Sequence, residues 1–274
     1  MAAVKEGTLS TGVPYLRLGE GPPLLVASGL TAEHANPTGA WRRMSLSWAA
    51  PFAEHFTVYL VNRRPGLAPG STMSDIAADY AGAIEQDIGE PVALHGTSTG
   101  GSVALQLAVD RPELIQRMVL AAAACRLSPH GRKVMDEVAQ LVRQGDKRRA
   151  TSLIVRTGTP RRWAVVTRGM GWVMGGFTPD DQDDMLVTIA AEDSFDAEPD
   201  LRRVQAPTLV LGGADDEFYS RDLFERTAAG LPRGRAVVLP GKSHVYVAGS
   251  KVAAGIALGY LLGGDGRQPT VSTD

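Results

Sequence analysis

The chain has 274 residues, of which 44% are hydrophobic, so it is long enough for one large domain with a buried core. Its formal net charge of −2 at pH 7 argues against nucleic acid or an anionic membrane as the main partner. The single cysteine, Cys125, excludes an internal disulfide and a cysteine-based zinc site. With no signal-peptide pattern and no apolar run of about 18 residues, we expect a soluble, cytoplasmic protein.

The first half of the chain alternates strand patterns with helix patterns. Strands are expected at residues 13–18, 24–28, 56–61 and 92–94, and helices at residues 41–55 and 73–88. The first two strands read as an early pair, separated by a Gly-rich and Pro-rich turn. Alternation at this spacing predicts a mostly parallel, twisted sheet flanked by helices, wound by right-handed crossovers.

Ser98 lies between the strand at residues 92–94 and a helical pattern that ends near Asp110. Gly96 and Gly100 flank it, and a tight strand-to-helix turn needs small residues at these two positions. The N-terminus of the following helix favours negative charge, as an oxyanion would require. The pattern therefore predicts a nucleophilic serine, and the alternative is a turn serine whose hydroxyl merely caps the helix.

A second loop is placed to assist Ser98. The strand at residues 24–28 runs into Ser28-Gly29-Leu30-Thr31, and a loop at this point can lend a backbone N–H to an oxyanion hole. We predict Leu30 and Thr99 as the two donors, while an ordinary connecting loop remains the alternative for Leu30.

The second half of the chain contains further strand patterns at residues 118–124 and 207–212. Between them lie helical patterns at residues 134–141, 150–155, 163–173 and 181–191. We therefore divide the chain into the first part of a core domain (1–125), a helical cap (126–200) and the second part of the core (201–274), with a flexible tail from about residue 263. Candidate substrate-pocket residues are His34, Trp163, Trp172, Met174 and Phe177. Core packing explains the aromatic and methionine side chains about as well, and a solvated loop position is the alternative for His34.

A serine hydroxyl is a weak nucleophile until a base removes its proton, so a histidine and an orienting carboxylate are expected elsewhere. The late chain offers both. One strand ends at Gly212-Gly213 and is followed by Asp215, Asp216 and Glu217, and a strand ending at Leu239 precedes His244. A serine, an acid and a histidine in this chain order are typical of α/β hydrolases. The alternative for His244 is a structural histidine.

The chain resembles the serine-nucleophile, esterase-like members of the α/β-hydrolase superfamily over about residues 8–262. The motifs that carry the resemblance are GTSTGG around Ser98, SGL at residues 28–30, NRRPG at 62–66, GGADDEF at 212–218 and GKSH at 241–244. The resemblance implies an α/β-hydrolase fold with a helical cap inserted before the acid-bearing strand. It also implies Asp216 as the acid, three residues after Gly213, with Asp215 as its rival.

Two positions depart from the family pattern. Ser28-Gly29 stands where many members have His-Gly, but the oxyanion hole uses backbone groups and should survive this change. Thr97 stands where many members have histidine or tryptophan, which leaves the subfamily open.

From these residues we expect a carboxylesterase-like enzyme that forms an acyl-enzyme on Ser98, with Asp216 and His244 completing a catalytic triad and no metal or cofactor. The expected partner is a small-molecule acyl substrate, and the sequence leaves open whether the chain forms a homodimer. The same machinery could hydrolyse a thioester, a lactone or a carbon–carbon bond, or perform cofactor-free perhydrolysis. A non-catalytic ligand-binding protein on a hydrolase fold is the alternative from a different class.

Overall fold

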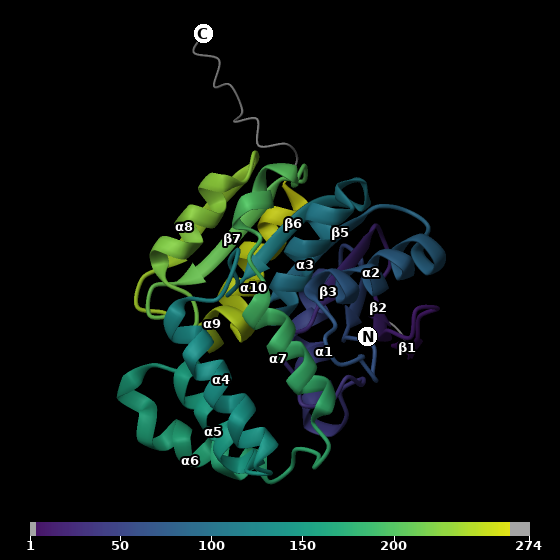
Figure 1. The fold of residues 1–274 in the computed structure, drawn as a ribbon. Helices are drawn as coiled ribbons and strands as arrows, with labels where there is room; N and C mark the ends of the chain where they lie inside the picture. The colour runs from purple at the N-terminus through teal and green to yellow at the C-terminus, as the bar shows by residue number, and fades with distance from the viewer. Residues whose placement is uncertain (1–3, 264–274) are drawn as a thin grey trace.

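The computed structural model describes residues 4–263, which form one eight-stranded sheet with helices on both faces (Figure 1). The tail expected after residue 263 lies outside the described residues. In spatial order, the strands are β1 (Lys5–Thr8), β2 (Pro14–Leu18), β4 (Thr57–Val61), β3 (Pro23–Ala27), β5 (Val92–Thr97), β6 (Ile115–Ala121), β7 (Thr208–Gly213) and β8 (Gly234–Leu239). Only the β1–β2 and β2–β4 pairs are antiparallel, so the predicted mostly parallel sheet is confirmed.

The start of the sheet differs from the expectation of an early strand pair. β2 and β3 do not pair with each other, because β4 lies between them and pairs with both. The short edge strand β1 was not expected from the sequence. Three of its four residues are exposed, so it lacks the buried apolar pattern that marks the inner strands.

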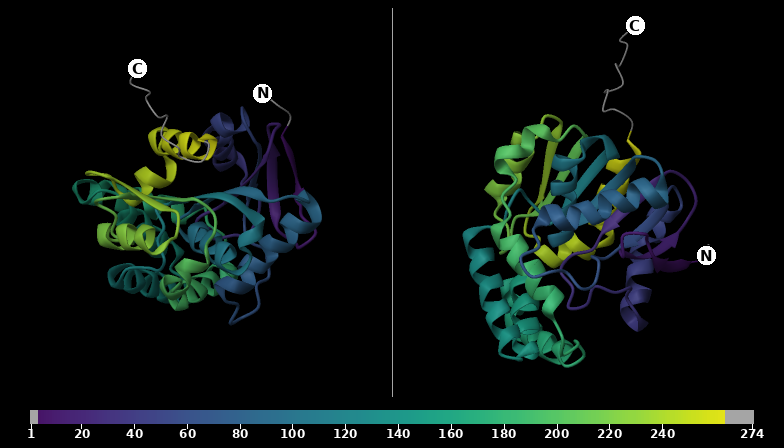
Figure 2. Two further views of the ribbon diagram at one scale, coloured as in Figure 1. Left: turned by 90° about the horizontal axis from the view of Figure 1, so that it is seen from above. Right: turned by 45° about the vertical axis from the view of Figure 1, so that its right-hand side comes forward.

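The helices outside the segment between β6 and β7 cover the two faces of the sheet. One face carries α1 (Gly39–Ala53) and α10 (Lys251–Leu262), and the other carries α2 (Met73–Ala83), α3 (Thr99–Asp110) and α8 (Arg221–Gly230), as the left view of Figure 2 shows. A π-helical turn (Ile84–Ile88) extends α2, and short 3₁₀ turns occur at Pro112–Leu114, Arg161–Trp163 and Glu198–Arg203. The helix α9 (His244–Gly249) follows β8.

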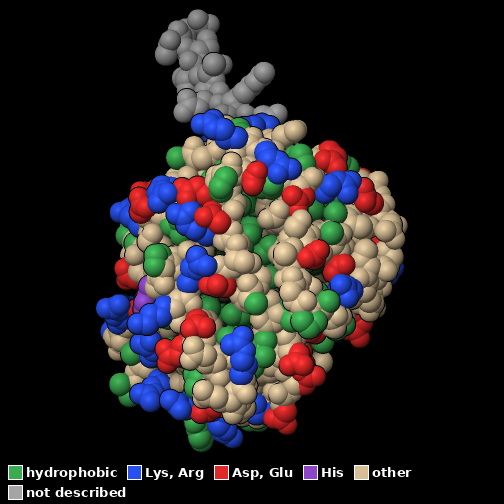
Figure 3. All heavy atoms as spheres, viewed as in Figure 1, with side chains coloured by type: hydrophobic (Ala, Val, Ile, Leu, Met, Phe, Trp, Pro, Cys, Tyr) green, Lys and Arg blue, Asp and Glu red, His purple; other side chains and the backbone are tan. Residues whose placement is uncertain are grey.

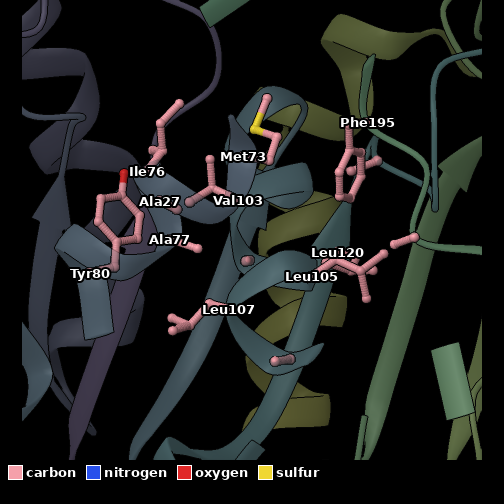
Figure 4. Close-up of a cluster of buried hydrophobic side chains, with 14 of the residues drawn as sticks. Ala27, Met73, Ile76, Ala77, Tyr80, Val103, Leu105, Leu107, Leu120 and Phe195 are labelled. Carbon is pink, nitrogen blue, oxygen red and sulfur yellow. The ribbon is translucent and has the colours of Figure 1, made fainter. Parts of the chain in front are cut away.

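Apolar side chains on each face of the sheet form a separate core. Figure 4 shows part of the larger core, where Ile76 and Tyr80 of α2 lie opposite Val103 and Leu107 of α3. Both helices pack their buried residues against the same sheet face. Only Ser98 separates the end of β5 from the start of α3, so the N-terminus of α3 lies at the carboxyl edge of the parallel strands, where ligands bind in sheets of this kind.

Four helices occupy the chain between β6 and β7: α4 (Pro129–Arg143), α5 (Lys147–Gly158), α6 (Ala164–Gly175) and α7 (Asp183–Ser194). They lie at the carboxyl edge of the sheet, with α5 between α4 and α6 (Figure 1). The last of them, α7, contacts α2. Within residues 4–263, no helix combines the length and the apolar character that crossing a membrane would need.

Candidate active site

Ser98 is the residue at which β5 turns into α3. Its backbone has φ 52° and ψ −127°, a positive φ that a non-glycine residue rarely adopts. The turn leaves no room for neighbouring side chains: a Cβ on Gly96 would lie 2.6 Å from the carbonyl oxygen of Gly100, and one on Gly100 would lie 2.3 Å from that of Ala27. These contacts explain why small residues flank Ser98, and the turn presents its side chain at the sheet edge.

The side chains of Ser98, His244 and Asp216 form a continuous hydrogen-bonded chain. His244 Nε2 lies 3.0 Å from Ser98 Oγ, and His244 Nδ1 lies 2.8 Å from Asp216 Oδ2. The histidine is only 8% exposed, and the carboxylate of Asp216 is fully buried. The arrangement can therefore take a proton from the serine hydroxyl while a buried carboxylate holds the imidazole in one tautomer.

The pairing of β7 with β8 positions the loop after β7, which carries Asp216. The two strands are parallel and in register to their ends, where Gly213 pairs with Leu239, and the backbone N–H of Asp215 donates to the carbonyl of Lys242. Asp216 Oδ1 accepts from the backbone N–H groups of Phe218 (2.8 Å) and Tyr219 (3.1 Å). Of the two candidate acids, Asp216 thus contacts His244, whereas the side chain of Asp215 is exposed.

The loop after β3 lies directly against Ser98. A Cβ built on Gly29 would lie 3.5 Å from the Cβ of Ser98. The predicted donor Leu30 follows in this loop, and the other predicted donor, Thr99, begins α3, where helix N–H groups have no acceptor within the helix. The two candidate N–H donors therefore come from two different elements, the loop after β3 and the start of α3, and their role stays a prediction.

Arg63, which follows β4, holds this loop from inside the protein. Its guanidinium is fully buried and donates to the carbonyl oxygens of Ser28 and Gly29 and to Thr31 Oγ1, each at 3.0 Å. Burial lowers the pKa of Arg63 from its ordinary value. Residues 62–66 form a motif in the sequence, but the motif does not indicate which of them faces inward, so the buried position of Arg63 was not predicted.

His34 belongs to the same buried group. Arg63 Nε donates to His34 Nε2 at 3.0 Å, and His34 Nδ1 lies 3.1 Å from the carbonyl oxygen of Arg64. Burial, followed by the charge of Arg63, lowers the pKa of His34 to about 4, so the ring is neutral at pH 7 with its proton on Nδ1. His34 is 3% exposed and both its ring nitrogens are bonded inside the protein, so it is not a solvated loop residue, and its role in a substrate pocket stays a prediction.

Glu192 on α7 is a second buried polar residue that the sequence did not single out. Its carboxylate accepts hydrogen bonds from Thr99 Oγ1 (2.7 Å), Ser102 Oγ (2.9 Å) and the hydroxyl of Tyr219 (3.2 Å). Burial raises its pKa. The stretch from 180 to 200 contains many acidic residues, and only the orientation of α7 distinguishes Glu192 from its exposed neighbours.

The four other predicted pocket residues lie on or beside α6. Trp163 (53%), Trp172 (50%) and Phe177 (87%) are exposed, and Met174 is partly buried. Arg148 stacks over Trp172, with 4.2 Å between its Cζ and the ring centroid.

Lys and Arg side chains gather along the lower left edge of Figure 3, where Figure 1 places α5 and α6. An open hollow of about 420 Å³ between these two helices is lined by Arg149, Ser152, Val165, Arg168, Gly169 and Trp172. The role of Trp163, Trp172, Met174 and Phe177 in substrate binding stays a prediction.

One group among the described residues offers atoms suited to a metal ion: Cys125, Asp196 and Glu198, whose ligand atoms lie within 4.8 Å of one another. Both carboxylates already pair with Arg126, and Glu198 also pairs with Arg226. Two arginines therefore satisfy the negative charge that would attract a cation, and the thiol of Cys125 is buried.

Comparison with known proteins identifies the family. The sequence model of the alpha/beta hydrolase family matches residues 24–253. The chain is 28% identical over 159 residues to a protein of Pseudomonas savastanoi named "Putative carbamate hydrolase RutD", covering 54% of this chain and 59% of that protein. A protein of the same name from Agrobacterium fabrum is 25% identical over 241 residues, covering 82% and 87% of the two chains.

A solved structure agrees with the fold. The enol-lactonase from Burkholderia xenovorans LB400 superposes with a TM-score of 0.76 at 19% identity, covering 94% of this chain and 99% of that one. At that identity, the likeness concerns the fold alone. Together with the match of the family model over most of the chain, it supports a single conclusion: the chain belongs to the alpha/beta hydrolase family.

Proposed function

We propose that the protein is a serine hydrolase that cleaves a carboxylic ester or a related acyl bond through an acyl-enzyme on Ser98. The observation that carries the proposal is the continuous contact from Ser98 Oγ through both nitrogens of His244 to Asp216, at 3.0 and 2.8 Å. A serine at positive φ on a strand-to-helix turn, with the N-terminus of α3 beside it, supports the same assignment.

In the first half of the reaction, Ser98 Oγ attacks the substrate carbonyl carbon while His244 Nε2 takes its proton. The carbonyl electron pair moves to oxygen, and the N–H groups of Leu30 and Thr99 bind the resulting oxyanion. The oxyanion then collapses, the bond to the leaving group breaks, and His244 returns the proton to that group. Asp216 stabilises the imidazolium form of His244 throughout.

In the second half, water replaces the leaving group. His244 takes a proton from the water as its oxygen bonds to the acyl carbon, and a second oxyanion forms in the same place. Collapse breaks the bond to Ser98 Oγ, which recovers its proton from His244, and the carboxylic acid departs. The buried network around Asp216 and His244 excludes bulk water from the imidazole, which strengthens its electrostatic contacts.

The choice among acyl bonds is the less constrained part of the proposal. A carboxylic ester is our first assignment, and the names of one similar sequence and one similar structure add carbamates and enol-lactones to the substrates to be tested. Thioester, lactone or carbon–carbon bond hydrolysis and perhydrolysis would use the same three side chains. Buried, hydrogen-bonded reacting groups support the reaction class, whereas the aromatic residues near α6 are exposed and give less indication of the substrate.

The experiment is covalent labelling of the full chain with a fluorophosphonate, followed by intact-mass measurement and turnover of a panel of short p-nitrophenyl esters, carbamates and lactones. The wild-type protein should gain one label and hydrolyse a member of the panel, and Ser98→Ala should lose both properties. Ser71→Ala, a serine outside the site, serves as the control and should behave as wild type. A label on another residue of Ser98→Ala, or binding without turnover or adduct in the wild type, would overturn the proposal in favour of a different nucleophile or a ligand-binding protein.

A further inference from the structure

Glu192 connects the helical segment between β6 and β7 to both sides of the candidate active site. It is 3% exposed, and its two carboxylate oxygens accept from hydroxyl groups on α3 and on the loop after β7. Burial raises the pKa of Glu192, and the positive charge of Arg63, which is also buried, acts in the opposite direction by favouring the ionised carboxylate. A buried acid with three hydroxyl donors is a fully bonded network, in which each member restrains the others.

The first contact reaches the oxyanion side. Thr99 follows Ser98 directly, and its backbone N–H is the predicted donor from α3. Its hydroxyl donates to Glu192 Oε2 at 2.7 Å, and Ser102, one turn later on the same helix, donates to Oε1 at 2.9 Å. Glu192 therefore bonds to two positions in the first turn of α3 and restrains the backbone that carries the oxyanion donor.

The second contact reaches the acid and base. The hydroxyl of Tyr219 donates to Glu192 Oε1 at 3.2 Å, and the ring of Tyr219 lies parallel to that of His244, with 6.0 Å between centroids and 13° between planes. The backbone N–H of Tyr219 also donates to Asp216 Oδ1 at 3.1 Å. Fixing Tyr219 thus restrains one side of the imidazole and one acceptor of the carboxylate.

The placement of Glu192 on α7 is part of a regular pattern. Asp184, Thr188 and Glu192 are four residues apart and therefore share one helix face. Asp184 accepts from the backbone N–H groups of Gly66 and Leu67, and Thr188 Oγ1 lies 3.3 Å from His34 Nε2. One face of α7 therefore contacts the loop after β4, the loop after β3 and the first turn of α3.

We propose that Glu192 is a positioning residue for the reaction, holding Thr99 and Tyr219 so that the oxyanion donor and the His244 ring keep their places relative to Ser98. This inference rests on the proposed function. It goes beyond that function because it makes a helix outside the core sheet part of the catalytic geometry. Glu192 does not touch the reacting atoms. It acts through Thr99, the predicted oxyanion donor, and through Tyr219, which contacts His244 and Asp216.

A merely structural role predicts a different outcome from a positioning role. If Glu192 only stabilises the fold, its loss lowers the melting temperature and leaves the rate of the folded fraction unchanged. If it positions the site, the folded protein reacts more slowly with a label that needs little binding. Glu192→Gln separates the two roles, because the amide keeps the size of the side chain and one acceptor but cannot accept from all three hydroxyls.

The test measures the rate constant of fluorophosphonate labelling, together with kcat, KM and melting temperature on a short p-nitrophenyl ester. In Glu192→Gln, the labelling rate constant and kcat should both fall by about tenfold or more at similar KM, a smaller effect than the loss of a whole oxyanion donor. Thr99→Val, which keeps the backbone N–H and removes the hydroxyl, should give a similar fall. The double variant Glu192→Gln with Thr99→Val should be little slower than either single variant, since both remove the same contact.

Asp193→Ala is the matched control, because Asp193 is the next residue on α7, is 54% exposed at its side chain and pairs with Arg132 at the surface. It should keep the wild-type rate within about twofold. Wild-type labelling and kcat in both Glu192→Gln and Thr99→Val would overturn the inference and leave the proposed function standing. Failure of the wild type itself to label would instead overturn the proposed function. If Glu192→Gln does not fold, the result for Thr99→Val decides between the two roles.

Discussion

Among the helices between β6 and β7, α7 and α6 differ in which kinds of side chain they bury. On the side of α7, polar side chains are buried: Thr188 is fully buried and Glu192 is 3% exposed. On the side of α6, apolar side chains are exposed: Trp172 is 50% exposed and Phe177 is 87% exposed. Buried polar groups and exposed apolar groups are the two informative departures from ordinary burial, and here they occur within one stretch of chain.

The difference comes from the surface on which each helix packs. α7 packs where the loops after β3, β4 and β7 expose polar groups, and these groups need partners once water is excluded. α6 packs mainly on α5 through small residues: a Cβ on Gly171 would lie 2.6 Å from Ser152 Cα, and one on Gly175 would lie 2.6 Å from Arg148 Cα. We infer that the α7 side governs reaction geometry, whereas the α6 side can vary without disturbing it.

The largest effect is expected at the buried end of the network, in Asp216→Asn. The amide can no longer favour the imidazole tautomer that accepts the Ser98 proton, and it cannot stabilise the imidazolium, so kcat should fall by about 10⁴-fold. The fold should persist, because the amide oxygen can still accept from the backbone N–H groups of Phe218 and Tyr219. Ester turnover and circular dichroism of the same sample check both parts.

Asp215→Asn is the matched control for this change. Asp215 is the adjacent residue, its side chain is exposed, and its contact with the β8 loop is made by its backbone N–H. Its kcat should stay within about twofold of wild type. A large loss in Asp215→Asn with activity retained in Asp216→Asn would transfer the acid role to Asp215.

A second effect concerns stability and pH at the loop that α7 contacts. The pKa of His34 is lowered to about 4 from 6.5, so the unfolded chain binds a proton on this residue at a pH where the native protein does not. The contribution of neutral His34 to the free energy of unfolding is therefore fully present above about pH 6.5. It is lost as the pH falls towards 4, by up to about 3 kcal/mol. Urea unfolding between pH 7.5 and 4.5 measures this slope.

His34→Gln should reduce the slope, because glutamine does not titrate in this range. The remaining slope has an expected source in His95, whose pKa is also lowered to about 4 by burial. Since His95 is unchanged in the variant, it provides an internal reference. Equal pH slopes of the unfolding free energy in the two proteins would mean that His34 takes up its proton as readily in the native state as in the unfolded chain, contrary to its buried contacts.

Much of the fold and of the site geometry follows from local patterns. Ser98 sits between a buried strand and a helix with glycines around it, and Asp216 and His244 each follow a strand end. Parallel strands bring their carboxyl ends to one edge, so residues far apart in the chain could be expected to meet there. The structure brings the three side chains together, and their catalytic roles stay predictions.

Other features depend on contacts that no local pattern contains. The insertion of β4 between β2 and β3 is set by pairing between distant strands, and β1 lacks a buried pattern altogether. Arg63 and Glu192 look like ordinary charged residues in sequence, because burial of a charge is decided by the arrangement of surrounding loops. A solvated loop position was one expectation for His34, but its ring is buried and contacts Arg63 and Thr188.

The smallest effect is expected on the exposed side, in Phe177→Ala. Phe177 follows α6 and is 87% exposed, so its removal should change the free energy of unfolding by less than about 0.5 kcal/mol and leave kcat on a short ester unchanged. Phe195→Ala is the matched comparison, because Phe195 follows α7, is 7% exposed and belongs to the core of Figure 4, and its loss should cost about 3–5 kcal/mol. Urea unfolding and ester kinetics on both variants test the contrast directly. A large fall in kcat for Phe177→Ala would show that the α6 side also controls the reaction, and the division between the two sides would have to be abandoned.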